Sequence, residues 1–340
     1  MMEHFSEGPI EPIPEVHPSI TTPVIACPPK FEKPDQQSNI WVRSLTSLAL
    51  YLILGYYIFP SYKILLLITA IVMIHEMGHF LAMKFFGYND LGIFFIPLLG
   101  AYVSGSKREV SQKQSAIILL AGPLPGIVLG IAIYLIWQYH PGFSIVGISL
   151  YTVSLSFIFL NLINLIPVYP LDGGQLLNRV FLDEESKLSK VFIFLSIIFL
   201  CWIALFGMSK PFYPLLIFPA MMLFRLFGQK KMTDVEKRIE EEGIHTDLEY
   251  EDLPDEDYWK IRNILIEEHP AFKEVAKVPP YKYSDKEEKI MSTIKNLLHR
   301  HLIQDISIAG KILIVLIWVA AITSPWLLNM DMSFLNRFGF

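Results

Sequence analysis

Long apolar stretches separated by short polar ones run through most of this chain. Seven of them are candidate membrane-spanning helices, at residues 44–60, 63–86, 115–138, 145–168, 190–208, 211–228 and 307–328. A helix needs about 20 mostly apolar residues to cross the hydrocarbon layer of a bilayer. The fifth and sixth stretches are short and meet at Ser209-Lys210-Pro211, so they form either two crossings or a hairpin. The pattern predicts an all-α polytopic membrane protein with about six to seven transmembrane helices.

A further apolar piece, Leu91–Ser104, is too short to span a membrane. It contains Gly92, Pro97 and Gly100, and Gly105 follows it. Non-helical backbone is tolerated at membrane depth only where protein or water satisfies its polar groups. We therefore expect a short re-entrant, β-like loop between the second and third spans.

The polar segments divide the chain into regions. Residues 1–43 are rich in proline and show no secretory signal pattern, which predicts a disordered cytoplasmic tail and an uncleaved first span. Residues 44–228 form the expected transmembrane core. Residues 307–328 form the expected C-terminal transmembrane helix, and residues 329–340 an external tail.

The one sizeable polar region after the core is residues 229–306. It begins acidic and carries Ile261, Ile264 and Leu265 at helical spacing, which indicates an amphipathic helix. Charge runs are usually solvated faces. We therefore expect a small, mostly helical cytoplasmic domain and assign it no specific role.

Lysine and arginine residues gather in alternate loops. They are frequent in the N-terminal tail, in residues 84–113, in residues 179–190 and in residues 229–306, and rare in the loops between these segments. Cytoplasmic loops of membrane proteins carry such an excess of positive charge. We therefore expect the N-terminus inside, the C-terminus outside and an odd number of spans.

Composition supports the membrane reading and excludes other classes. Hydrophobic residues make up 53% of the chain and charged residues 18%, whereas soluble domains carry about 25% charge. The net charge of −5 gives no reason to expect nucleic acid as a partner. Cys27 and Cys201, the two cysteines, lie in a polar tail and an apolar run, which argues against a disulfide framework or a thiolate metal site.

The second span carries the sequence His75-Glu76-Met77-Gly78-His79. Side chains at positions i and i+4 lie one turn apart on the same face of a helix, so His75 and His79 can bind one metal ion. Glu76 lies beside them and can accept a proton from an attacking water. Ionisable residues inside a spanning helix are functional by default. The alternative is a histidine pair satisfied by a neighbouring helix, but this leaves a buried Glu76 without an evident partner.

A hydrolytic zinc site needs a third protein ligand and an open position for water. The candidate is Asp172, in the run Asn164–Gly174 that ends the fourth span. Pro167 and Pro170 end or bend that helix, and the two glycines after Asp172 permit a sharp turn. Taken alone, this run also fits an ordinary Pro-Asp-Gly turn. The expected directions of the second and fourth spans, however, place Asp172 and the histidine pair at the same depth.

Together these motifs resemble the site-2 protease family of intramembrane zinc metalloproteases. The match consists of His75-Glu76-Met77-Gly78-His79 followed by Asn164–Gly174, in the family's order, and covers roughly residues 63–180. The paired motifs are highly specific. The resemblance implies a zinc metalloendopeptidase that cuts peptide bonds in or near transmembrane segments.

The resemblance also implies a role for each polar residue. His75, His79 and Asp172 correspond to the ligands of one zinc ion per chain. Glu76 corresponds to the catalytic base. Asn164 corresponds to an asparagine that positions the substrate or stabilises the oxyanion.

Leu99–Val103 resembles the family's re-entrant strand. We expect Gly100, Ala101, Tyr102 and Val103 to bind an unwound substrate by main-chain hydrogen bonds.

Ala121–Leu124 resembles the small-residue start of the family's next core helix, where backbones approach closely. The chain departs from some relatives because it has no insertion large enough for a PDZ domain, and residues 229–306 show no pattern of a CBS pair.

Two rival functions stay open at this point. One is a membrane zinc protease that uses a glutamate as its third ligand, although the acidic residue at the right depth is Asp172. The other is a catalytically inactive metal-binding membrane protein or a transporter-like relative.

The expected partners are a membrane-spanning protein substrate and the lipid bilayer. The family variant suggests a bacterial plasma membrane, with the site toward the cytoplasm. The resemblance implies release of membrane-tethered regulators or clearance of signal-peptide remnants. The sequence does not distinguish between these two functions. The sequence likewise does not indicate the oligomeric state.

Overall fold

The computed structural model describes residues 27–32, 39–59, 61–97, 100–107, 110–182, 186–207, 211–278, 281–298 and 302–330. Most of the predicted N-terminal tail, most of the predicted external tail and Leu99 of the expected strand lie outside this set.

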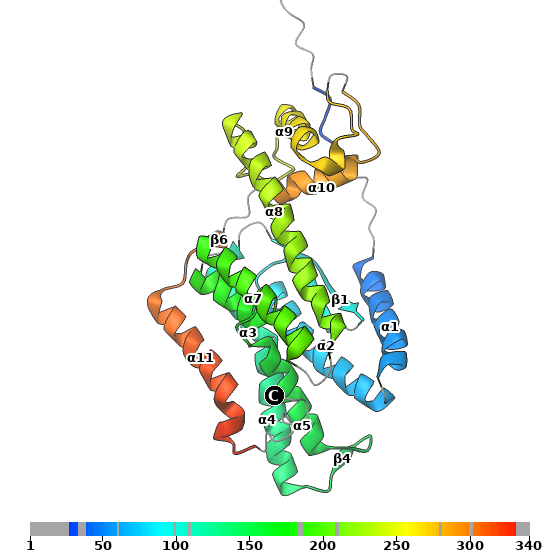
Figure 1. The fold of residues 1–340 in the computed structure, drawn as a ribbon, viewed down its shortest axis with the longest axis vertical. Helices are drawn as coiled ribbons and strands as arrows, with labels where there is room; N and C mark the ends of the chain where they lie inside the picture. Colours follow the sequence, from blue (N-terminus) through cyan, green and yellow to red (C-terminus); the bar gives the residue numbers. More distant parts are fainter. Residues whose placement is uncertain are drawn as a thin grey trace, which may run out of the picture.

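The described part of the chain is mostly helical (Figure 1). Five of its helical segments are long and apolar enough to cross a membrane: α1 (Ile40–Ile58), α2 (Tyr62–Phe85), α3 with α4 (Gln112–Ala121 and Pro123–Tyr139), α7 (Lys187–Phe206) and α11 (Ile308–Leu327). Two shorter apolar helical segments are α5 (Leu150–Asn164) and Tyr213–Phe224, which joins η2 (Tyr213–Leu216) to the start of α8. The seven predicted spans all contain helix, and the number of full crossings stays a prediction.

The fourth predicted span is shorter than expected. Residues 144–149 form a small hairpin of β4 (Ser144–Ile145) and β5 (Ile148–Ser149) before α5 begins. Its turn places Gly147 at a φ of 77°, a left-handed conformation that favours glycine. At the other end α5 stops at Asn164, before Pro167, because proline lacks the N–H that a continuing helix needs.

The expected re-entrant loop is an antiparallel pair of strands, β1 (Asn89–Ile96) and β2 (Gly100–Ser106). Helix α1 packs on this hairpin: the rings of Tyr51 and Phe95 lie 5.7 Å apart, and the Phe95 N–H donates to Ser47 Oγ. This hairpin lies where the sequence predicted a short β-like loop within an otherwise helical protein. A third short pair joins β3 (Val110–Ser111) to β6 (Leu302–Ile303) in parallel.

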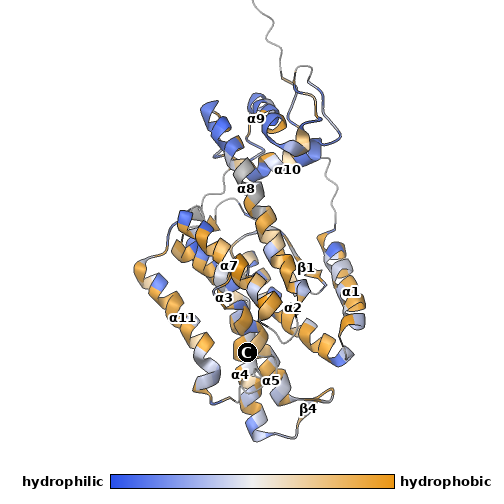
Figure 2. Cartoon of the chain, in the orientation of Figure 1, coloured by the Kyte–Doolittle hydropathy of each residue, from blue (hydrophilic) through white to orange (hydrophobic). Residues whose placement is uncertain are grey.

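Helix α8 (Ile217–Glu241) continues from its apolar start into the polar part of the protein, so residue 228 lies inside one helix. Beyond it follow α9 (Asp255–Glu268), η3 (Pro270–Phe272) and α10 (Glu287–Leu297). We call residues 232–278 and 281–298 the polar domain. It has its own buried core, to which Val235 and Ile239 of α8 contribute. In Figure 2 its helices are largely hydrophilic, whereas the helices below them are largely hydrophobic.

A buried ion pair lies at the centre of the polar domain. Arg262 of α9 is fully buried and donates from Nε to Glu287 Oε1 across 2.7 Å. The Tyr258 hydroxyl donates to the same oxygen across 2.6 Å, and the Ser284 N–H donates to Oε2. Burial raises the pKa of the Glu287 carboxyl, but the hydrogen bonds from Arg262, Ser284 and Tyr258 outweigh it and hold the pKa below its ordinary value.

After the polar domain, the chain contacts the transmembrane core again at Asp305 and at Trp318. Asp305 accepts hydrogen bonds from Ser111 Oγ and the Lys113 N–H at the start of α3. Trp318 of α11 donates its indole N–H to the Leu165 carbonyl across 2.7 Å. That carbonyl lies at the end of α5, where helical carbonyl groups lack partners. Helix α11 therefore supports the turn that carries Asp172.

Candidate metal centre

His75 and His79 lie one turn apart on α2, and their side chains are almost completely buried. Helix α2 is apolar along nearly its whole length and is capped by Ser61, whose side chain accepts from the Lys63 N–H. The Nε2 atoms of His75 and His79 lie 3.1 Å apart. The pair therefore points at one place, as the helical spacing predicts.

A hydrogen bond to each ring orients the two imidazoles. His75 Nδ1 lies 2.8 Å from Asn161 Oδ1, and the Asn161 amide donates from Nδ2 to the Phe157 carbonyl. That second bond turns the amide oxygen toward His75. His79 Nδ1 lies 2.8 Å from the Ile118 carbonyl. Since both partners are acceptors, each Nδ1 carries the proton and each Nε2 presents a lone pair.

Asp172 opens the short helix α6 (Asp172–Leu176), which follows the turn after α5. Its Oδ2 lies 3.0 Å from His75 Nε2 and 3.3 Å from His79 Nε2. The turn folds back tightly because the two glycines after Asp172 face backbone: a Cβ on Gly173 would lie 2.1 Å from the Leu165 carbonyl oxygen. The close approach of the backbone therefore explains the glycines here.

The three residues fit a zinc ion. Two unprotonated Nε2 atoms and a carboxylate oxygen all face one another, and the ligand atoms lie within 4.8 Å of each other. Asp172 Oδ2 is buried and finds no hydrogen-bond partner within the described part of the chain. Buried acceptors that face one another without a donor are unfavourable, and a cation between them removes that cost. Tetrahedral zinc with bonds of about 2.0–2.1 Å holds its ligand atoms roughly 3.3 Å apart, which matches the distances here.

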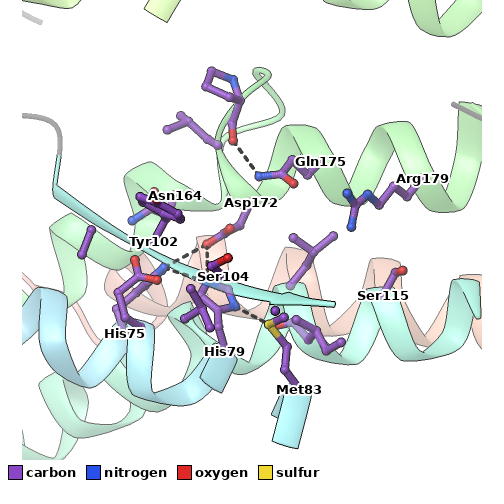
Figure 3. A pocket seen from close by; sticks show the side chains of 18 of the residues that line it. His75, His79, Met83, Tyr102, Ser104, Ser115, Asn164, Asp172, Gln175 and Arg179 are labelled. Atoms are coloured by element: carbon purple, nitrogen blue, oxygen red, sulfur yellow. Dashed lines mark hydrogen bonds and ion pairs between the residues drawn. The ribbon is translucent and has the colours of Figure 1, made fainter. Parts of the chain in front are cut away.

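A cleft of about 640 Å³ opens onto these residues (Figure 3). Glu76 lines it beside the histidine pair, and Lys107 and Arg179 also line it. Strand β2 crosses the cleft, where Figure 3 labels Tyr102 and Ser104. No strand among the described residues pairs with the other edge of β2. The cleft therefore combines the candidate metal ligands, a carboxylate and a free strand edge.

The residues predicted from the sequence are not all placed alike. Ala101, Tyr102 and Val103 line the cleft, whereas Gly100, at the start of β2, does not. Asn164 also lines the cleft, and its amide donates to the Leu160 carbonyl across 3.2 Å.

Sequence reasoning missed Asn161, which contacts His75 from α5 and is 1% exposed. A signal was present, because a polar amide in the middle of an apolar helix needs a partner.

Glycine at two positions lets α2 approach the junction of α3 and α4. A Cβ on Gly78 would lie 1.9 Å from the Ala121 carbonyl oxygen. A Cβ on Gly122 would lie 2.3 Å from His79 Nε2. Both distances are far below van der Waals contact, so the site as built excludes any side chain there. Ala121 and Gly122, the small residues that begin the run Ala121–Leu124, therefore allow α2 to pack closely here.

Comparisons with known proteins bear on the same region. The family model described as peptidase family M50 matches residues 63–157, which include the histidine pair and end before Asp172. Stage IV sporulation protein FB of Bacillus subtilis is 28% identical over 189 residues, 52% of this chain and 63% of that protein. A zinc metalloprotease of Methanocaldococcus jannaschii is 28% identical over 203 residues, 58% of this chain and 56% of that protein. The chain thus spans less than two thirds of each relative.

Among solved structures, a site-2 protease from Methanocaldococcus jannaschii matches with a TM-score of 0.39 and 24% identity. The match covers 54% of this chain and 85% of that one.

Proposed function

The chain is a member of the site-2 protease family of metalloproteases, and from that premise we propose that it hydrolyses peptide bonds in or near the membrane-spanning segments of other proteins. The observation that carries this proposal is the buried convergence of His75, His79 and Asp172 beside Glu76, in a cleft with a free strand edge.

In this proposal His75, His79 and Asp172 hold one zinc ion per chain. The ion, when bound, supplies Lewis acidity toward a peptide carbonyl and toward water. Glu76 accepts the proton of the attacking water and returns it to the leaving amine. Asn164 donates a hydrogen bond to the developing oxyanion through the amide hydrogen that the Leu160 carbonyl does not accept.

Strand β2 supplies the substrate site. A peptide bond in an intact helix is shielded by the helix's own hydrogen bonds, so the substrate unwinds before cleavage. Residues Gly100–Val103 then pair with the extended substrate through main-chain groups, which place little demand on sequence. Gly100 begins this strand without lining the cavity, so it would contribute only through its main chain next to the cleft.

The protein is a membrane protein, and we place its site toward the cytoplasm of a bacterial plasma membrane. Lys107 and Arg179 line the cleft, and residues 84–113 and 179–190, to which they belong, are rich in lysine and arginine, as cytoplasmic loops are. Residues 229–306 then lie in the cytoplasm. The substrates belong to the class of membrane-tethered regulators or signal-peptide remnants.

The test compares the purified chain with its Glu76→Gln and Asp172→Ala variants. We expect stoichiometric zinc in the parent and in Glu76→Gln, with cleavage of a model transmembrane substrate slowed by about 10³-fold or more in Glu76→Gln. Asp172→Ala should lose both zinc and cleavage. Zinc is measured by mass spectrometry and cleavage by gel. A parent without zinc, or Glu76→Gln with the parental rate, would overturn the proposal.

A further inference from the structure

Residues 27–32, which precede α1, lie on the polar domain more than 200 positions later in the chain. Cys27 and Phe31 pack against the buried core of that domain. The surface that receives the segment is aromatic: Trp259 stacks on Tyr283 with 16° between the ring planes, and Tyr281 meets Trp259 edge-on. We call Tyr250, Trp259, Tyr281 and Tyr283 the aromatic groove.

The aromatic groove binds the segment through its main-chain carbonyl groups. The Trp259 indole N–H donates to the Pro28 carbonyl across 2.8 Å. The Tyr283 hydroxyl donates to the Pro29 carbonyl, and the Tyr250 hydroxyl donates to the Phe31 carbonyl across 2.6 Å. Three carbonyls of one short segment therefore each accept from an aromatic side chain.

Lys30 supplies the charged contact. Its Nζ donates to the Glu251 and Leu253 carbonyls across 2.5 and 2.8 Å, and its backbone N–H donates to Asp255 Oδ1 across 2.7 Å. The ammonium also lies 5.6 Å from the centre of the Tyr250 ring. Hydrogen bonds from a charged group are stronger than neutral ones, so Lys30 carries much of the docking energy.

Proline suits this site for a physical reason. Pro28 and Pro29 have no N–H that would need a partner, and they bias themselves and Cys27 toward extended backbone. An extended proline segment loses little entropy when it docks, and aromatic grooves recognise such segments in other proteins. The contacts of Pro28 and Pro29 match that mode of recognition.

We propose that the aromatic groove is a recognition site for a basic proline-rich segment, and that residues 27–32 of the same chain occupy it as a strap. The strap ties two helices together. Seven residues separate Glu32 from Ile40, where α1 begins. A fully extended linker of this length spans at most roughly 30 Å. Helix α8 belongs to the polar domain's core through Val235 and Ile239. Docking therefore limits how far α1 moves from α8.

Alkylation of Cys27 tests the docking in the full chain. Cys27 is half-buried and its thiol donates to the Tyr281 hydroxyl at 3.3 Å, so the docked thiol reacts slowly with a maleimide. The background is Cys201→Ser, which removes the other thiol. We expect Lys30→Glu to speed alkylation by about tenfold or more, and Pro28→Ala combined with Pro29→Ala to speed it severalfold. Lys273→Glu is the matched control, since Lys273 is an exposed lysine of the same domain. Parental rates in the Lys30 and proline variants would overturn the proposal.

The tie between the helices is tested by spin labels at Val42→Cys of α1 and Glu240→Cys of α8, both exposed positions, in a chain with Cys27→Ser and Cys201→Ser. We expect a narrow distance distribution in this parent, a broad one with Lys30→Glu and a narrow one with Lys273→Glu. A broad parental distribution, or no broadening with Lys30→Glu, would show that the strap does not restrain α1. Neither experiment needs proteolytic activity, so failure here leaves the proposed function untouched.

Discussion

Asn161 Oδ1 faces His75 Nδ1 at 2.8 Å and joins α5 to the candidate metal ligand on α2. The next polar residue of α5, Asn164, lies one turn further on and donates to the Leu160 carbonyl. Two asparagines on one helix therefore serve different groups: the first holds a ligand's ring, and the second lines the cleft.

This difference predicts that the same substitution at the two positions has different effects. Asn161→Leu removes the acceptor that keeps His75 in the tautomer with a free Nε2, and should weaken zinc binding about 10–100-fold. Asn161→Asp keeps an acceptor and should retain zinc. Asn164→Leu should slow cleavage without changing zinc affinity. Competition with a chelator measures the affinity, and equal affinities for Asn161→Leu and Asn164→Leu would refute the assignment.

Pairing of the substrate with β2 predicts a particular sensitivity to proline. Tyr102 and Val103 are neighbours, so their N–H groups point to opposite sides, one toward β1 and one toward the free edge. Proline at either position removes a donor, whereas alanine keeps it. We expect Tyr102→Pro and Val103→Pro to slow cleavage of a transmembrane substrate more than the alanine variants do. Equal losses for proline and alanine would argue against strand pairing.

The contact at Gly78 predicts a large loss of stability. A Cβ there meets the Ala121 carbonyl oxygen at 1.9 Å, and neither backbone can move without separating α2 from α3. Gly78→Ala should therefore cost about 3 kcal/mol. Gly228→Ala on α8 is the control, because no atom lies within 4 Å of its added Cβ and alanine favours a helix. Tryptophan fluorescence during heating compares the two, and a Gly78→Ala chain as stable as the parent would contradict the packing.

The Arg262–Glu287 pair predicts how the polar domain responds to acid. The pKa of the Glu287 carboxyl is lowered in the folded state, so its contribution to stability is complete above the unfolded value of about 4.3 and is lost as pH falls through the folded value. Hydrogen-exchange protection of α9 and α10, corrected for intrinsic rates, should fall below about pH 4.3.

Glu287→Gln should remove that pH dependence and lower stability at neutral pH by about 3 kcal/mol, because it leaves Arg262 buried without a counter-charge. Glu274→Gln is the matched control: its carboxylate pairs with Lys286 but is 85% exposed, so protection should hardly change. Equal effects of the two substitutions would show that burial of the pair is unimportant.

The sequence determined those features that depend on local periodicity. Apolar runs predicted helices at all seven places, although α5 proved shorter because Gly147 and Pro167 limit it. Spacing of four residues put His75 and His79 on one face, since a helix repeats every 3.6 residues. The expected directions of two spans predicted that Asp172 lies level with the histidine pair, and its Oδ2 lies 3.0 Å from His75 Nε2.

Only the tertiary structure decided which faces of different helices meet. Whether Asn161 reaches His75 depends on the rotation of α5 about its own axis, which is set by packing against α2 and α4. The pairing of β1 with β2 likewise joins two strands separated by a turn. The docking of residues 27–32 on the aromatic groove joins groups that are distant in sequence. Local pattern cannot encode such contacts, because they depend on shape and hydrogen-bond complementarity between surfaces that only the folded chain brings together.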